Sequence, residues 1–237
     1  MESKGKRPGK GDGEEPRRGI GAGSARSAAA RLRAVRIALA HDLIRVAKIL
    51  DRRGMIVASE GLLSARVAGD RILITRRGRR RADMTPRDFV ELGVLEPADS
   101  QARLAASAEH RVHLVAYAIR RDVEAIVHAH PVALTAFALR GHAPDLSRFD
   151  TAVATLGPIG FVAYRPAGSE ELAEAVGAAL DPRDAVARPH VLVLQNHGAL
   201  AVGANAEEAL SRLEGGPDGF RELLAPRGAI AHEADRA

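Results

Sequence analysis

The sequence of 237 residues contains no cysteine and no tryptophan, and aromatic residues make up only 3% of it. The lack of cysteine excludes disulfide scaffolds and thiolate chemistry, so a transition metal would have to be held by His, Asp or Glu. The scarcity of aromatic residues argues against base-stacking platforms for nucleic acids. No apolar run reaches the length of a membrane span, and the N-terminus has no apolar signal core. We therefore expect a cytoplasmic protein without a membrane partner.

Hydrophobic residues make up 46% and charged residues 27% of the chain, which is typical of a globular protein with a sizeable core. The net charge of +5 is unevenly distributed. The segment up to Arg36 contains ten basic and four acidic residues, a balance of +6, so the remaining chain carries −1. A tail rich in Gly, Pro, Lys and Arg cannot bury enough apolar surface to fold. We predict a disordered, solvated basic tail over residues 1–27 and do not expect nucleic acid as a partner.

The rest of the chain mixes helix and strand signals. Apolar residues recur at helical spacing from Ala28 to Arg53, and Gly54 ends that helix. Further helices are expected after the capping residues Thr85, Ser107, Ser169 and Asn205 and from Pro131, and strands over 62–67, 71–75, 123–128, 191–195 and 199–202. The first two strands must be antiparallel because only a short turn joins them. These signals predict an α/β fold with one domain, residues 28–213, whose mixed and largely antiparallel sheet is covered by helices.

Two histidines, His128 and His130, stand at the end of the β-prone run 123–128. Positions i and i+2 of a strand point to the same face, so both imidazoles could grip one ion. His197 lies in a second strand-then-glycine segment. Three neutral imidazoles with an open fourth position are typical of catalytic zinc. The alternative is a surface histidine pair and an unrelated loop histidine.

A carboxylate and a further histidine, Glu109 and His113, are four residues apart on the helix expected after Ser107, so they share a face. One interpretation is an exposed pair that stabilises the helix slightly. The other is a carboxylate beside the metal that shuttles a proton. Spacing alone does not decide between them.

Several segments together resemble the class II aldolase/adducin family, in particular its fuculose-phosphate aldolase-like members. The central signature is Ser107-Ala108-Glu109-His110-Arg111-Val112-His113, then Tyr117, then Ala125-Ile126-Val127-His128-Ala129-His130-Pro131. Asn196-His197-Gly198 resembles the loop of the third metal ligand. Gly61-Leu62-Leu63-Ser64, Ile74-Thr75-Arg76-Arg77-Gly78 with Thr85-Pro86, and Ala167-Gly168-Ser169 match further segments in order. The resemblance covers about Ala28 to Leu213.

The resemblance implies a three-layer α/β/α fold and a lyase that cleaves a C–C bond of a small hydroxy-carbonyl or sugar-phosphate-like substrate through an enediolate. It implies that His128, His130 and His197 bind Zn²⁺ and that Glu109 is the general acid/base. Substrate or phosphate would contact Gly61, Ser64, Thr75, Gly78 and Ser107. Mn²⁺, Co²⁺ or Fe²⁺ could replace Zn²⁺ at three histidines. The family's ring-shaped assemblies imply a homotetramer.

Some positions depart from the family pattern. Leu62 stands where the family usually has asparagine, and Ala108 replaces a serine, so two hydrogen-bond donors are missing. Gly215-Gly216-Pro217 breaks a helix that relatives continue, and no tyrosine follows, so residues 214–237 form a divergent segment. The arginine-rich run 76–81 is either a solvated loop or an anion-attracting rim that compensates for Leu62. Epimerase, decarboxylase, dehydratase or a non-catalytic adducin-like binding module therefore remain alternatives.

Overall fold

The computed structural model describes residues 20–95, 100–146, 156–180, 188–215 and 220. Its helices are α1 (Ile20–Arg52), α2 (Gln101–Ala105), α3 (His110–Ile119), α4 (Val132–Arg140), α6 (Glu170–Leu180) and α7 (Ala206–Glu214), with 3₁₀ turns at Arg81–Asp83 and Pro86–Asp88. Its strands are β1 (Leu62–Ala68), β2 (Arg71–Thr75), β3 (Phe89–Gly93), β4 (Ala125–Ala129), β5 (Ile159–Val162), β6 (Val191–Leu194) and β7 (Gly198–Gly203). Residues 1–19 of the predicted tail, and most of the predicted C-terminal segment, lie outside the described residues.

The strands form one sheet in the order β3-β2-β1-β4-β7-β6-β5. Every neighbouring pair is antiparallel except β5 and β6, which are parallel. The prediction of a mixed, largely antiparallel sheet is thus confirmed. β1, β4 and β7 lie at its centre, where His128 pairs with Leu62 on one side and with Leu200 on the other.

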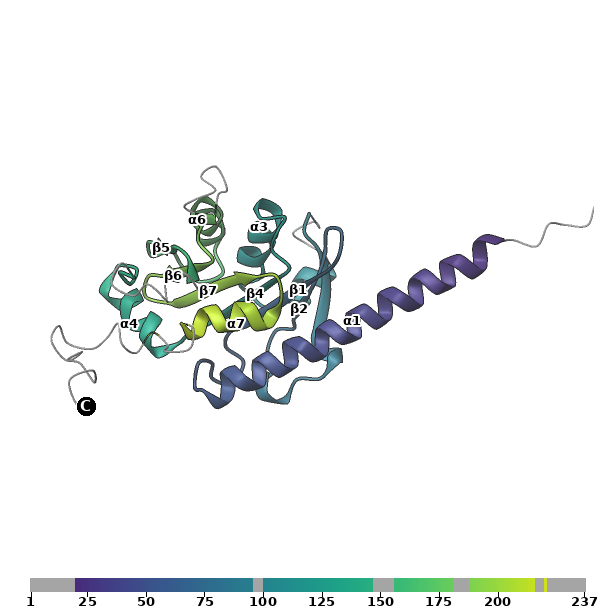
Figure 1. Cartoon of the computed structure of the whole chain (residues 1–237), viewed down its shortest axis with the longest axis horizontal. Coiled ribbons are helices and arrows are strands. Elements are labelled where there is room, and N and C mark those ends of the chain that lie inside the picture. The colour runs from purple at the N-terminus through teal and green to yellow at the C-terminus, as the bar shows by residue number, and fades with distance from the viewer. Residues whose placement is uncertain (1–19, 96–99, 147–155, 181–187, 216–219, 221–237) are drawn as a thin grey trace, which may run out of the picture.

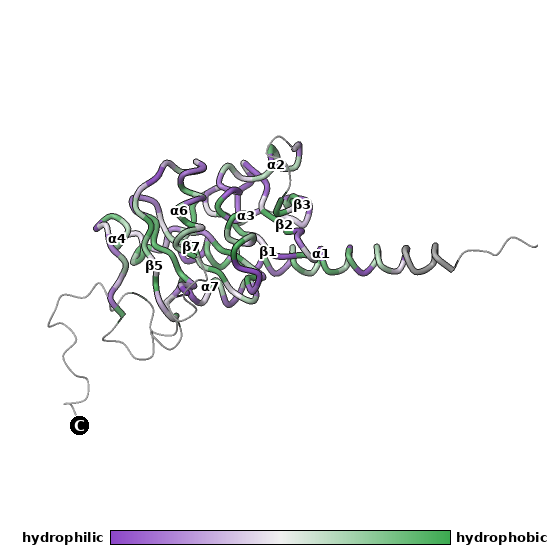
Figure 2. Tube along the Cα trace, turned by 90° about the horizontal axis from the view of Figure 1, so that it is seen from above, coloured by the Kyte–Doolittle hydropathy of each residue, from purple (hydrophilic) through white to green (hydrophobic). Residues whose placement is uncertain are grey.

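Helices cover both faces of the sheet, as the resemblance implied (Figure 1). One apolar cluster joins α1, α4 and α7 to one face, and the other joins α3 and α6 to the opposite face. Along β4 the side chains alternate, so that Val127 faces α1 and Ile126 faces α3, as the two-residue period of a strand requires. Figure 2 shows the apolar stretches along the central strands and the polar ones in the surrounding loops.

Helix α1 begins at Ile20, eight residues before the predicted start at Ala28, so the prediction of a disordered tail is wrong for residues 20–27. Its N-terminal part projects away from the sheet and its side chains from Arg26 to Ala38 are exposed (Figure 1). Alanine and arginine, which dominate this part, have high helix propensity, a signal that the tail's glycines and prolines obscured. None of the helices in the described ranges combines the length and apolar character needed to cross a membrane.

Three of the four predicted helix-capping residues are confirmed, and one prediction is wrong. Thr85 forms a capping box with Asp88, Ser169 accepts a hydrogen bond from the Leu172 amide, and Asn205 accepts one from the Glu208 amide, as expected. Ser107 does not cap α3, which begins at His110 with Glu109 in the N-cap position. The backbone of residues 106 and 107 instead pairs with the end of β2, and this moves the helix start.

Candidate metal centre

The three histidines converge at one end of β4 and β7. His128 is the next-to-last residue of β4, His130 follows its end, and His197 directly precedes β7. The antiparallel pairing of these strands brings the end of one beside the start of the other. One ligand atom from each histidine lies within 4.8 Å of the other two.

Two glycines make room for this arrangement. A Cβ at Gly198 would lie 2.4 Å from Cδ2 of His130 and 2.7 Å from the Ala129 carbonyl oxygen, so no other residue fits after His197 without a shift. Gly61 has a φ of +73°, and a Cβ there would lie 2.9 Å from the His128 carbonyl oxygen. The local sequences around the histidines are therefore dictated by close packing at the site.

Glu109 faces two of the histidines at once. Its Oε2 lies 2.9 Å from His128 Nδ1 and its Oε1 lies 3.4 Å from His197 Nε2. Burial acts to raise the pKa of the Glu109 carboxyl, but hydrogen bonds and charge attraction from His128 and His197 outweigh burial and hold that pKa well below its usual value. An ionised carboxylate beside the three imidazoles can accept a proton.

The donor set fits a divalent transition metal. His128 is buried, and its Nε2 has no hydrogen-bond partner in the described part of the chain. A buried nitrogen without a partner is costly unless something else binds it. Burial lowers the pKa of His130, which favours the neutral imidazole that metals bind. Glu60 lies 3.5 Å from His130 Nδ1, the position of a carboxylate that orients a metal-binding imidazole.

The loops expected to bind substrate lie together beside this centre. The Ser107 amide donates to the Thr75 carbonyl, and Ala106 forms an isolated bridge with Arg76. The Arg81 guanidinium donates to the carbonyl of Gly61 and to carbonyls of the turn that contains Gly78. The fold thus gathers Gly61, Thr75, Gly78 and Ser107 from three separate segments.

The hydroxyl of Ser64, unlike these loops, does not lie beside the metal centre but contacts side chains of α3. Ser64 is a fully buried residue of β1, and its Oγ lies 2.7 Å from Nδ1 of His113 and 2.9 Å from the hydroxyl oxygen of Tyr117, both on α3. Of the two interpretations of Glu109 and His113, the exposed helix pair is therefore not what the structure has, because His113 is buried with Ser64 at its Nδ1 and Glu109 faces His128 and His197. Burial lowers the pKa of His113 well below its usual value, so this imidazole is neutral.

Two further positions face the interior. Thr75 is fully buried, and its Oγ1 lies 3.5 Å from the Leu63 amide nitrogen. Leu62 is 1% exposed and packs in the apolar cluster under α3. The replacement of the family's asparagine by Leu62 thus affects the packing beside His128. The Leu62 side chain points into the apolar cluster and not toward a ligand.

Two residues near the site carry no recognisable signal in the sequence. Glu60 precedes the glycine turn and belongs to no motif. Arg81 stands in the arginine run for which the sequence favours a solvated loop or rim, yet it is 1% exposed. Its burial depends on how three distant segments meet, and no local pattern reports that.

Comparison with known proteins bears on what this arrangement does. The profile of the Class II Aldolase and Adducin N-terminal domain matches residues 41–215. A 5-methylthioribulose-1-phosphate/5-deoxyribulose-1-phosphate aldolase of Rhodospirillum rubrum is 33% identical over 175 residues, 74% of this chain and 75% of that protein. A methylthioribulose-1-phosphate dehydratase of Acidiphilium cryptum is 30% identical over 181 residues, 74% of this chain and 84% of that protein.

Solved structures agree with the sequence matches. The L-fuculose-1-phosphate aldolase of Thermus thermophilus superposes with a TM-score of 0.66 and 27% identity, covering 78% of this chain and 92% of that one. The matched profile spans well over half of the chain and includes the three histidines and Glu109. This protein therefore belongs to the class II aldolase and adducin N-terminal domain family.

Proposed function

We propose that this protein is a metal-dependent lyase of the class II aldolase type that cleaves a C–C bond of a small hydroxy-carbonyl, sugar-phosphate-like substrate. The observation that carries the proposal is the convergence of His128, His130 and His197, together with the Glu109 carboxylate that faces two of them. An adducin-like binding module would need neither the ligand set nor the charged carboxylate. The aldolase and dehydratase names of the relatives support chemistry on phosphorylated ketoses.

The three histidines and Glu109 would have different roles in the reaction. A zinc ion, or Mn²⁺, Co²⁺ or Fe²⁺, held by the three imidazoles would supply a Lewis acid that withdraws electrons from the substrate's oxygens. Glu109, which is ionised and partly shielded from solvent, would accept the hydroxyl proton of the substrate as the C–C bond breaks. The same group would return a proton to the carbon left behind, so that protons balance over one turnover.

The turns beside the centre would hold the other end of the substrate. Gly61, Gly78 and Ser107 come from three segments that meet next to the histidines, and backbone amides at such turns suit an anionic group. The buried hydroxyls of Ser64 and Thr75 would support these segments from within. Substrate specificity would thus rest on the turns, and bond cleavage on the metal centre.

Metal analysis tests the centre directly. The purified protein should carry about one divalent metal per chain by mass spectrometry. His128→Ala/His130→Ala should lose it, while His41→Ala, an exposed histidine of α1, should keep it. Full metal content in the double variant would contradict the assignment, and no metal in the wild type would favour a binding module.

Product analysis separates aldolase from dehydratase activity. Incubation with methylthioribulose 1-phosphate, 5-deoxyribulose 1-phosphate and fuculose 1-phosphate should yield an aldehyde and a three-carbon phosphate. A dehydratase would instead yield one product of the full carbon skeleton that has lost water. An epimerase would change only the configuration, and a decarboxylase would release carbon dioxide. Mass spectrometry of the products distinguishes these outcomes.

We also propose that the chain assembles as a homotetramer, as the family resemblance implies. Helix α7 ends at Glu214, and Gly215 follows in a left-handed conformation, so α7 itself does not continue past this point. Light scattering at micromolar concentration should give about four times the 25.1 kDa mass of one chain, and a monomer would contradict this.

A further inference from the structure

Arg81 is a buried cation that has no carboxylate partner in the described ranges. It is 1% exposed. Its Nε and Nη2 donate to the Gly61 carbonyl at 3.0 and 2.7 Å, and its Nη1 donates to the carbonyls of Arg79 at 2.8 Å and Arg76 at 3.4 Å. Burial lowers the pKa of Arg81 to about 10, so the guanidinium remains charged at neutral pH. Such a charge is expensive to bury, and neutral carbonyls compensate it only in part.

The carbonyls that Arg81 binds belong to two different turns. The first turn, residues 58–61, ends at Gly61 against the His128 carbonyl and carries Glu60 beside His130. The backbone amide of Arg81 also donates to the Ala58 carbonyl, at 2.9 Å, so this turn is held at both of its ends. Its conformation needs such support, because Ala58 has a φ of +53°, a left-handed conformation that strains a residue other than glycine.

The second turn, residues 76–79, follows β2 and contains Gly78. The Arg77 amide donates to the Ala105 carbonyl, which links this turn to the segment that leads to Ser107. Arg81 thus fastens the turn next to the metal histidines to the turn next to Ser107.

We propose that Arg81 is a positioning residue that locks these two turns into the arrangement that receives the substrate. The role of the turns rests on the proposed function, whereas the lock rests on the hydrogen bonds. A lysine cannot replace it, because one ammonium group lacks the planar fork that reaches three carbonyls. Its neighbours in the run do not share the role. Arg79 pairs with Asp88, and Arg80 is exposed and lies 3.9 Å from Asp83.

Hydrogen–deuterium exchange of the metal-loaded full chain tests the lock. Arg81→Lys should raise exchange in peptides covering residues 58–61 and 76–79, with little change in β4 and β7. Arg80→Lys is the matched control and should leave both turns as they are in the wild type. Arg81→Gln serves as a second variant if the lysine variant does not fold. Unchanged exchange in both turns of a folded Arg81 variant would overturn the lock.

Anion affinity tests the consequence for the substrate. The dissociation constant of inorganic phosphate, from calorimetry, should rise about 10- to 100-fold in Arg81→Lys, because displaced binding groups cost that much. KM for the phosphorylated substrate should rise with it, while metal content stays unchanged. Looser turns with unchanged phosphate affinity would make Arg81 a stabilising residue only and overturn its positioning role. Absence of phosphate binding by the wild type would instead refute the proposed substrate end, and the positioning role with it.

Discussion

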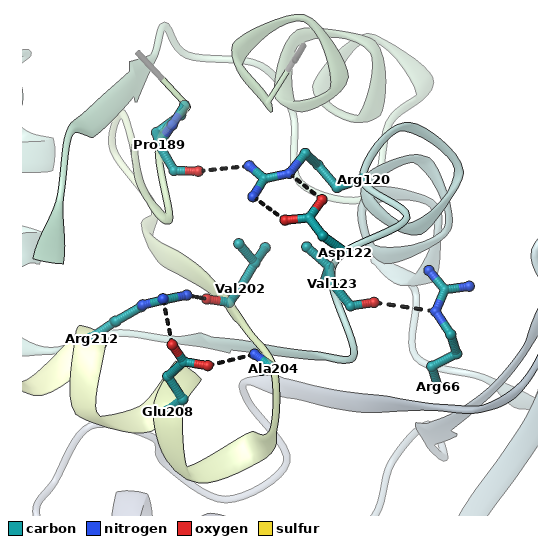
Figure 3. Close-up of polar contacts among 9 residues, drawn as sticks. All are labelled: Arg66, Arg120, Asp122, Val123, Pro189, Val202, Ala204, Glu208 and Arg212. Atoms are coloured by element: carbon teal, nitrogen blue, oxygen red, sulfur yellow. Dashed lines mark hydrogen bonds and ion pairs between the residues drawn. The ribbon is translucent and has the colours of Figure 1, made fainter. Parts of the chain in front are cut away.

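The two ends of β4 and β7 are both polar, but they are built on opposite rules. At the end away from the histidines lie Arg66, Arg120 and Arg212, which we name the arginine end (Figure 3). Arg120 donates to both carboxylate oxygens of Asp122, at 2.8 and 2.7 Å, and to the Pro189 carbonyl. Arg66 donates to the Val123 carbonyl, and Arg212 donates to the Val202 carbonyl. Here the protein supplies the partners of its own charges.

The histidine end leaves groups without such partners. Glu109 faces two histidines that would both bind a metal, and His128 Nε2 is buried without a hydrogen-bond partner in the described part of the chain. Buried polar groups that the fold itself satisfies hold the structure together, whereas those left open are available to a ligand. The groups left open to a ligand thus lie at one end of the same two strands.

The largest expected effect is at Glu109. Glu109→Gln keeps the shape of the side chain but removes the base, so kcat should fall about 10²- to 10⁴-fold while the fold and metal content are retained. Glu124→Gln, whose carboxylate lies 3.9 Å from Arg66 at the arginine end, is the matched control and should keep full turnover. Steady-state kinetics with the identified substrate measures both. Normal turnover of the Gln variant would make Glu109 a purely structural group.

Replacing Gly198 by a larger residue should disrupt the metal site at the histidine end by steric crowding alone. In Gly198→Ala, the new Cβ would collide with the His130 ring and displace a ligand, so metal affinity should fall about 10- to 100-fold. Gly160→Ala makes a similar collision, with Leu192 at the β5 edge, and should destabilise the protein without changing metal affinity. Metal titration with a chelator distinguishes the two. Equal metal affinity in both variants would show that the close packing around His130 is not needed for binding.

Much of the fold and of the metal centre could be predicted because both rest on short-range patterns. The hairpin of β1 and β2 follows from two β-prone runs and one tight turn, and the histidine pair follows from the two-residue period of a strand. His197 stood out because it lies in a second strand-then-glycine segment, and the family resemblance added it to the ligand set. Glu109 came from family resemblance, and the structure places it between His128 and His197.

The rest could not be predicted because it depends on long-range packing. Ser64 was expected to face the substrate, but its partners His113 and Tyr117 lie about 50 residues away in the sequence, on a different element. Arg81 looks like its exposed neighbours in sequence, and only the meeting of two turns buries it. The Glu109–His113 spacing left a helix pair and a carboxylate beside the metal equally open, and only the structure shows that Glu109 precedes the first turn of α3.

The arginine end should respond to pH. Hydrogen bonds from Arg120 lower the pKa of Asp122 from 3.8 to about 2. Because the folded pKa is depressed, the pair contributes stability that is fully present above about pH 4 and is lost as the pH falls toward 2. Asp122 is 55% exposed, so solvent screening reduces the effect, and Asp122→Asn should cost about 1 kcal/mol at pH 7.

Urea unfolding of the wild type and Asp122→Asn across this range measures that contribution. The difference between them should shrink toward zero as the pH falls from about 4 to 2. Asp70→Asn, in the turn between β1 and β2, is the control and is measured under the same conditions. A difference that does not change with pH would mean that Asp122 acts through packing rather than through its charge.

An effect of similarly small size is expected between the two ends, in the buried network of Ser64, His113 and Tyr117. The Arg66 guanidinium stacks 4.9 Å from the Tyr117 ring centre, and His113 follows Glu109 by one helical turn, so the network spans both ends. His113 Nε2 has no hydrogen-bond partner among the described residues. If Tyr117 donates to Ser64 and Ser64 donates to His113 Nδ1, only the Nε2–H is left over. The reverse direction would also leave the Tyr117 proton without an acceptor, and each buried unsatisfied group is costly.

We therefore expect Tyr117 to donate, and His113 to carry its proton on Nε2. Tyr117→Phe then removes one hydrogen bond but leaves Ser64 paired with His113, so the free energy of unfolding should fall by only about 0.5–1.5 kcal/mol, with metal content unchanged. In the reverse arrangement the Ser64 proton would lose its acceptor, and the loss would exceed about 2 kcal/mol. Nitrogen chemical shifts of His113 give the tautomer independently of stability. If the proton is instead found on Nδ1, His113 donates to Ser64 and the expected direction of the network is wrong. The unpaired group near the histidine end is then the lone pair of His113 Nε2 and not an N–H donor.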